Sequence, residues 1–291
     1  MLPIPSAIQG FRAYLQRRNY AAHTLASYML DLQLFFTDTD TPLAQISFRE
    51  VDRFIDTQHH QGLAAATINR RLYALKHFFD FLIDHHLVGA NPVKPSHPLR
   101  RGRTLPRALS REQVEQLFAH IQHPMDKALF LLMLRCGLRV SEVAQLKLRD
   151  IDWAQQALLV EQGKGRKDRR VYLSADALAS LHACLQQRPR AAPGEAVFWN
   201  QKRPHRPLSS KAIQKKMERY AEAAGIVASC HRLRHTFASN LLEQGAEIVS
   251  IKELLGHASI SSSERYAKVS NQKVKQVYLK TMRKVLQQSK V

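Results

Sequence analysis

The segment at residues 231–242, "HRLRHTFASNLL", contains two histidines four positions apart. Side chains at that spacing share one face of a helix, and HExxH zinc sites use such a pair together with a carboxylate. Here, however, Arg232 and Arg234 stand between the histidines, and two guanidinium groups would repel a divalent cation. The planar arginine fork instead matches the oxygens of a phosphate. We therefore predict that this segment binds an anion and that the protein holds no metal ion.

The net charge indicates the class of anion. The chain has 291 residues, with 44 Lys and Arg against 24 Asp and Glu, which gives a formal net charge of +20. Such an excess is typical of nucleic-acid binding, because each neutralised phosphate releases counterions. An anionic membrane is the alternative, but no strongly basic amphipathic helix with flanking aromatics occurs early in the chain. The longest apolar run, residues 128–134, is far too short to span a bilayer.

The three cysteines are scattered along the chain and form no CxxC pair. This pattern argues against a disulfide framework or a zinc knuckle, and it suits a reducing compartment. The first residues, "MLPIPSAIQGF", lack the basic stretch and apolar core of a signal peptide. No Walker P-loop and no acidic metal cluster is present, so we expect no cofactor. The expected location is the cytoplasm, in association with the nucleoid.

Periodicity divides the chain into two helical parts. Residues 1–95 contain four segments with apolar side chains at helical spacing, and Ser47 with Glu50 predicts a capping box at the start of the third. Residues 96–106 are rich in proline and arginine, and we interpret them as a linker that lies along phosphates.

The pattern restarts in residues 107–291. Ser110 predicts an N-cap, and "ALFLLML" predicts a buried helix that ends in a turn at Gly137. The segment "ALLVEQGKGRKDRRVYLS", residues 157–174, predicts a β-hairpin. A final helix at about 270–288 carries an apolar stripe that includes Tyr278 and Met282, and such a stripe needs a partner surface in its own domain or in a neighbour.

Further motifs accompany the opening segment. They are Arg139 and Glu142 in "GLRVSE", Lys164 in "GKGRKDR", His257 in "LLGHASIS", and Tyr266 nine residues later. In this order and spacing, the motifs strongly resemble the tyrosine recombinase (phage integrase) family, most closely its Xer-type and transposon-resolution members. The resemblance covers essentially the whole chain. It implies a mainly α protein, with an N-terminal helical core-binding (SAM-like) domain and an α-rich catalytic domain that contains a small β-sheet or hairpin.

The resemblance implies six catalytic residues, which are Arg139, Lys164, His231, Arg234, His257 and Tyr266. Tyr266 would attack a DNA phosphodiester and form a 3′-phosphotyrosine, His231 would act as its general base, and Lys164 would protonate the 5′-hydroxyl leaving group. A tyrosine with a pKa of about 10 is hardly ionised at pH 7, so it needs a base and a positive field. Lys167 is a nearby competitor of Lys164, and Tyr278 is the nearest rival of Tyr266, although its apolar stripe favours a core position.

In the same scheme, Arg139 and Arg234 bind the non-bridging oxygens of the phosphate, and His257 donates a hydrogen bond to it. Glu142 supports neighbouring side chains, and His235 is a packed or hydrogen-bonded residue rather than a catalytic one.

Other basic residues are candidates for DNA contact or else belong to solvated faces. They are Arg70, Arg71, Lys76, Arg101, Arg103, Lys211, Lys215 and Arg219. Departures from the family pattern leave a mobile-element role open. Ser229-Cys230 replaces a frequent Thr-Pro pair, Asn240 a frequent histidine, and Ala267-Lys268 a common Thr-His pair.

The resemblance implies a double-stranded DNA recombination site as partner, with a dimer on the site and a tetramer in the synapse, because cleavage of four strands requires four protomers. A second recombinase or an accessory protein is a further possible partner. The final helix is the candidate tether between protomers. The alternatives are a type IB topoisomerase-like enzyme, a non-catalytic DNA-binding accessory protein, and a metallonuclease.

Overall fold

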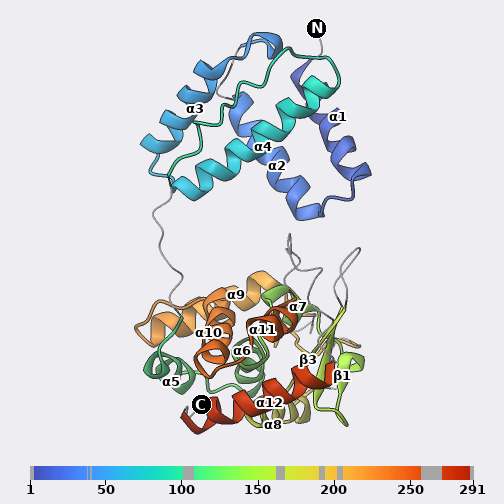
Figure 1. Cartoon of the computed structure of the whole chain (residues 1–291), viewed down its shortest axis with the longest axis vertical. Coiled ribbons are helices and arrows are strands. Elements are labelled where there is room, and N and C mark those ends of the chain that lie inside the picture. The colour runs from blue at the N-terminus through green and yellow to red at the C-terminus, as the bar shows by residue number, and fades with distance from the viewer. Residues whose placement is uncertain are drawn as a thin grey trace. The chain divides into compact units, whose positions relative to one another are not determined.

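The computed structural model describes residues 3–37, 39, 41–100, 108–161, 168–189, 194–201, 206–256 and 271–288, the last range with side chains from Lys275 onward. Its contacts divide the chain into two compact units, Met1–Thr104 and Leu105–Val291. Figure 1 shows helices in both units and strands in the second alone. The mainly α fold with a small sheet is therefore confirmed.

In its described residues, the first unit is built from four α-helices, as the periodicity predicts. They are α1 (Ile4–Arg17), α2 (Ala22–Thr37), α3 (Phe48–His60) and α4 (Ala65–Asp84), with a short 3-10 helix, η1 (Leu43–Gln45), before α3. The predicted capping box is confirmed, because the main-chain N–H of Ser47 donates to Glu50 Oε2 at 2.7 Å and Ser47 Oγ accepts from the N–H of Arg49. Helix α4 contacts the other three helices, and the ring of its Phe78 meets that of Phe11 on α1 edge to face, 5.5 Å between centroids.

The second unit surrounds helix α6. Its other helices are α5 (Arg111–Ala119), α7 (Val140–Gln145), η2 (Leu148–Asp150), α8 (Ala175–Gln186), α9 (Ser210–Ala223), α10 (Cys230–Glu243), α11 (Ile248–Leu255) and α12 (Asn271–Gln288). Nearly every residue of α6 (Pro124–Cys136) is buried, as expected for a helix that is apolar on all sides. Helices α8 and α10 make the most extensive contacts with it, and Figure 1 shows it enclosed by neighbouring helices.

Gly137 ends α6 in the left-handed conformation, with φ of 66°. A Cβ at this position would overlap the ring of Phe237 on α10, so both the backbone and the packing require glycine. The tight turn brings the chain directly into Arg139, the N-cap of α7. The sequence predicts this turn correctly, and the structure shows that it places a basic side chain beside the core.

The sheet has three antiparallel strands in the order β1-β2-β3. The predicted hairpin consists of β2 (Ala157–Val160) and β3 (Arg169–Tyr172), and its register pairs Val160 with Arg169. Strand β1 (Ile151–Asp152) adds a short third strand beside β2. Alternation along β3 buries Arg169 and Val171 and exposes Arg170.

The apolar stripe of α12 packs within its own unit. Tyr278, Met282 and Val285 are buried against α10, α11 and β3, and the Tyr278 hydroxyl donates to the carbonyl oxygen of Arg135 on α6 at 3.0 Å. The core assignment of Tyr278 is thus confirmed. The role of α12 as a tether between protomers stays a prediction.

All three cysteines, Cys136, Cys184 and Cys230, are buried free thiols. Burial raises the pKa of each of them, for Cys230 to about 11 and for Cys184 to about 12. Across the ranges that the structure describes, none of the helices has the length and apolar character needed to cross a membrane.

Candidate active site

Arg139 occupies the N-terminus of α7 and bonds back to that helix. Its main-chain N–H donates to Glu142 Oε2 at 2.7 Å, and its Nη1 donates to Glu142 Oε1, also at 2.7 Å. Its Nη2 donates to the carbonyl oxygen of Gly256, the residue after α11, at 3.1 Å. The side chain keeps 32% of its surface exposed, so this guanidinium group is oriented by the protein and still accessible.

Glu142 lies at the centre of the basic residues. Besides the Arg139 bonds, its two oxygens accept from Arg169, from Nη1 at 2.9 Å and from Nη2 at 2.8 Å. Burial alone would raise the pKa of this carboxyl, but the hydrogen bonds and charge of Arg169, followed by the hydrogen bonds of Arg139, lower it to about 2. Glu142 is therefore an anion at neutral pH and holds two arginines in place.

Arg234 approaches the same carboxylate from α10. Its Nη1 donates to the carbonyl oxygen of Gly137, and its Nη2 donates to that of Leu255 at 2.6 Å. Nη1 also lies 3.8 Å from Glu142 Oε2, which is an ion pair beyond hydrogen-bond distance. Burial, followed by the nearby charge of Arg139, lowers the pKa of Arg234 to about 10, so the guanidinium group stays protonated at pH 7.

Arg169, the first residue of β3, is a site residue that the sequence reasoning missed. Its side chain is 7% exposed, and its Nε donates to the carbonyl oxygen of Leu254 at 2.8 Å. The available signal was the strand alternation, which places Arg169 on the same face as the buried Val171. A run of cations such as "RKDRR" is more often a solvated turn, so this signal was weak.

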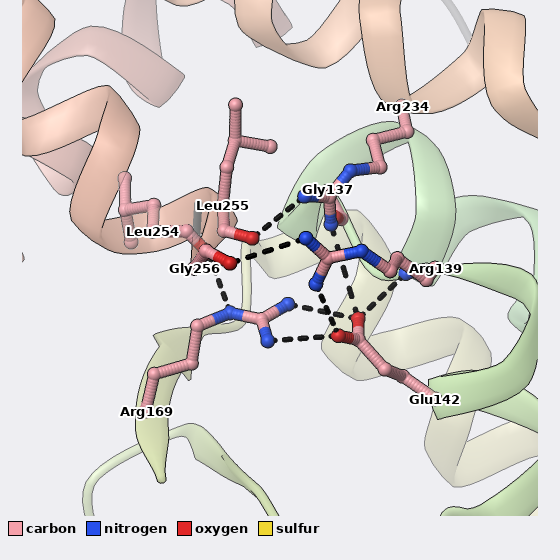
Figure 2. Close-up of polar contacts among 8 residues, drawn as sticks. All are labelled: Gly137, Arg139, Glu142, Arg169, Arg234, Leu254, Leu255 and Gly256. Carbon is pink, nitrogen blue, oxygen red and sulfur yellow. Dashed lines mark hydrogen bonds and ion pairs between the residues drawn. The ribbon is translucent and has the colours of Figure 1, made fainter. Parts of the chain in front are cut away.

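The last carbonyl groups of α11 join these arginines. Figure 2 shows three successive carbonyl oxygens, of Leu254, Leu255 and Gly256, each accepting from a different arginine. Carbonyl groups at the C-terminus of a helix lack partners within the helix and carry a partial negative charge. Arg139 at the start of α7, Arg169 on β3 and Arg234 on α10 satisfy them, so the cluster joins these three elements to the end of α11.

His231 completes the described part of the site. Ser229 caps α10 by accepting from the N–H of Arg232 at 3.2 Å, which puts His231 in the first turn of the helix. His231, Arg139 and Arg234 line one open cavity of about 500 Å³. The segment at residues 231–242 therefore contributes a histidine and an arginine to the lining of one cavity.

His235 lies one turn further along α10, is partly buried, and is not part of the lining of that cavity. Among the residues that the structure describes, no group of three metal-ligating side chains gathers. The two histidines of the opening segment are thus not equivalent, because His231 alone faces the cavity with the arginines.

Two family models match the chain. Residues 107–273 match the phage integrase family, and residues 8–86 match the phage integrase N-terminal SAM-like domain. The chain belongs to the phage integrase family. The resemblance to tyrosine recombinases and the SAM-like class of the N-terminal domain are both confirmed.

Similar proteins cover nearly the full length. The tyrosine recombinase XerC of Haemophilus ducreyi is 34% identical, over 92% of this chain and 94% of that protein. The XerC of Oceanobacillus iheyensis is 31% identical over 94% and 95%, and the XerA of Pyrococcus horikoshii is 30% identical over 92% and 91%.

Solved structures of integrases share the fold. The Tn1549 transposon integrase in complex with circular intermediate DNA has a TM-score of 0.75 at 18% identity, covering 93% of this chain and 98% of that one. A lambda integrase dimer bound to a COC′ core site has a TM-score of 0.73 at 22% identity, covering 93% and 100%. At these identities the likeness concerns the fold alone.

Several predicted residues of this family member lie outside the described residues. They are Lys164, with its competitor Lys167, His257, Tyr266, Arg101 and Arg103. Two described residues are close in sequence to members of this set. Arg169 begins the strand that follows the segment of Lys164 and Lys167, and Gly256 directly precedes His257.

The predicted DNA contacts on α9 are exposed. Lys211, Lys215 and Arg219 follow each other at intervals of four, so they share one side of the helix. Lys216 instead faces inward, where it donates to Asp126 Oδ2 at 2.9 Å. Within the described ranges, no ion pair joins the three exposed cations to a carboxylate.

The predicted contacts on α4 are already paired with carboxylates. Arg70 forms a two-point ion pair with the fully buried Asp31, and Nε of the largely buried Arg71 lies 3.9 Å from the same carboxylate. Lys76 donates to Asp80 at 2.6 Å on the surface. Burial raises the pKa of Asp31 despite the hydrogen bonds and charges of these arginines. A DNA phosphate would therefore compete with a carboxylate for each of these cations.

Proposed function

We propose that this chain is a site-specific DNA recombinase that breaks and rejoins DNA through a covalent bond between Tyr266 and a 3′-phosphate. The observation that carries the proposal is the placing of Arg139, Arg234 and His231 around one cavity, with both arginines fixed by the protein. Relatives that match over more than nine tenths of this chain are named tyrosine recombinases.

The two arginines suit the binding of a phosphodiester. Arg139 has five side-chain N–H groups and, within the described residues, donates two of them to protein oxygens, which leaves three for a ligand. Arg234 is charged at pH 7 and is held by two main-chain carbonyl groups. Donors that are oriented before the substrate arrives stabilise developing charge without reorganisation at the moment of reaction.

In the proposed cleavage step, the Tyr266 oxygen bonds to phosphorus while the bond from phosphorus to the 5′-oxygen breaks. His231 accepts the phenol proton, and Lys164 donates a proton to the departing 5′-oxygen. A 5′-hydroxyl from the partner strand then attacks the phosphotyrosine in the reverse sense. Each step exchanges one phosphate ester for another, so rejoining needs no external energy source and, in this scheme, no metal ion.

We further propose the domain organisation that the sequence predicts. It consists of a DNA-binding domain at 1–95, a basic linker at 96–106, and a catalytic domain at 107–291 with a helix for oligomerisation. The DNA partner is a duplex recombination site, bound by a dimer and synapsed by a tetramer. Lambda integrase supports this, because its solved structures include a dimer bound to a core site and a tetramer bound to a Holliday junction. We also propose that the protein acts at the nucleoid, because its proposed partner is DNA.

A nicked suicide substrate tests the proposal. Cleavage releases a short 5′-hydroxyl fragment that diffuses away, so the covalent protein–DNA adduct accumulates and is measured on a denaturing gel. The wild-type protein is expected to form the adduct in the presence of EDTA, and Tyr266→Phe is expected to form none while it still binds the site. An adduct that persists in Tyr266→Phe, or cleavage that leaves only free DNA ends, would overturn the proposal.

A further inference from the structure

Arg169 takes no part in the reaction scheme above, although it lies inside the arginine cluster. It does not line the cavity that Arg139, Arg234 and His231 share, and all three of its guanidinium nitrogens donate to protein oxygens. We propose that Arg169 is a positioning residue of the recombination reaction: it neutralises Glu142, so that Arg139 and Arg234 keep their charge for the phosphate, and it fixes the end of α11. This inference rests on the proposed roles of the two arginines.

The net charge of the cluster depends on Arg169. Three arginines and one glutamate give a net charge of +2, and without Arg169 the net charge falls to +1. A phosphodiester carries one negative charge, and its pentacoordinate state carries two once the nucleophile has added. The loss of one buried positive charge therefore weakens the binding of the pentacoordinate state more than that of the bound substrate, and this difference slows the chemical step.

Glu142 receives half of its hydrogen bonds from Arg169. It is 12% exposed and accepts four N–H groups from Arg139 and Arg169 together. Removal of Arg169 deletes two of the four and leaves a buried anion short of partners, which is costly. Nη1 of Arg234 lies 3.8 Å away, close enough to move into the vacated position. Arg234 would then bind the Glu142 carboxylate instead of the phosphate.

Arg169 also binds the C-terminal end of α11. The carbonyl groups of Leu255 and Gly256 are bonded by the two arginines that are proposed to bind the phosphate, whereas that of Leu254 is bonded by Arg169. Arg169 is thus the one arginine of the trio in Figure 2 that has no proposed contact with the phosphate. It holds the residues immediately before His257 in a fixed place.

Arg170 provides a matched control. It neighbours Arg169 in sequence and carries the same charge, but it lies on the opposite face of β3, where 44% of its side chain is exposed and its nearest carboxylate is that of Asp152, at 3.7 Å. Arg170→Ala therefore changes the net charge of the protein by the same amount without touching Glu142. Any effect specific to Arg169→Ala comes from the cluster.

The experiment measures two quantities on the full chain, the dissociation constant for a half-site in a gel shift and the rate of adduct formation on the suicide substrate at saturating protein. Arg169→Ala is expected to slow adduct formation about 100-fold and to change the dissociation constant by less than about threefold. Arg169→Lys should fall between wild type and Arg169→Ala, because it keeps the charge and loses the fork. Arg170→Ala should form the adduct at the wild-type rate.

A compensating change separates this role from a purely structural one. In Arg169→Ala/Glu142→Gln the stranded carboxylate is gone, so Arg234 is released, and the adduct rate should recover about tenfold over Arg169→Ala alone. Urea unfolding reports the folded fraction of each variant. If adduct formation per folded molecule equals that of wild type in Arg169→Ala, or if the double variant shows no recovery, the inference is wrong. If the wild-type protein itself forms no adduct, the result contradicts the proposed function and not the role of Arg169 alone.

Discussion

The hydroxyl of Tyr278 donates a hydrogen bond to the carbonyl oxygen of Arg135 at 3.0 Å, and both side chains are almost completely buried. This carbonyl group is in the last turn of α6, where helical partners run out, so Tyr278 satisfies a buried acceptor and fastens α12 to the central helix.

We predict that Tyr278→Phe lowers the free energy of unfolding by about 1–2 kcal/mol, because the ring stays and the acceptor loses its partner. Tyr278→Ala should lower it by about 3–5 kcal/mol, because a cavity is added. Urea denaturation measures both. If the two variants were equally stable, the ring of Tyr278 would contribute nothing to the packing of α12.

Gly137 offers a test of the turn that leads into Arg139. Gly137→Ala should destabilise the protein by well over about 2 kcal/mol, because a Cβ both strains a left-handed residue and overlaps the ring of Phe237. Gly225, with φ of 64° and open space around it, is the control, and Gly225→Ala should cost only about 1 kcal/mol. The difference in midpoint of unfolding between the two variants reports the overlap alone.

Glu142 should make stability depend on acid pH. Its pKa is about 2 in the folded protein, against 4.5 for an ordinary glutamate, so the folded state favours the carboxylate. The resulting stabilisation, roughly 3 kcal/mol, is complete above about pH 4.5 and is lost as the pH falls toward 2. Glu142→Gln lacks this contribution. The stability difference between wild type and Glu142→Gln, followed by denaturation at a series of pH values, should therefore shrink across this window.

Two neighbouring lysines on α9 should give opposite results. The exposed Lys215 is a candidate phosphate contact, so Lys215→Ala should lower the slope of log affinity against log salt by about 0.9 and leave stability unchanged. Lys216 is 15% exposed and paired with Asp126, so Lys216→Ala should lower stability by about 3 kcal/mol and leave the salt slope unchanged. Fluorescence anisotropy with labelled DNA gives the slope. An unchanged slope in Lys215→Ala would show that Lys215 makes no phosphate contact.

Local signals in the sequence predicted much of the fold. Apolar spacing identified the helices of both units, and Ser47 and Ser110 marked helix starts that the structure confirms by their hydrogen bonds. These features depend on residues within one or two turns of each other, which a single sequence displays directly. Strand β1 escaped notice because two residues are too few to show any alternation.

The site was harder to predict because its contacts join distant residues. Arg169 reaches Glu142 across 27 positions and Leu254 across 85, and no local pattern records either contact. The same holds for Arg70, whose carboxylate partner Asp31 lies 39 positions away on another helix. Charge alone suggested a solvated or DNA-facing side chain for Arg70, whereas the buried carboxylate decides where each guanidinium group lies.

The burial of every cysteine has a practical consequence. Thiol-reactive dyes require an accessible thiolate, and Cys136, Cys184 and Cys230 offer neither access nor an easily ionised thiol. A cysteine introduced at an exposed position in each unit would therefore be labelled selectively in the otherwise native sequence. Energy transfer between two such dyes could then follow the separation of the two units, one molecule at a time, while DNA is bound, cleaved and released.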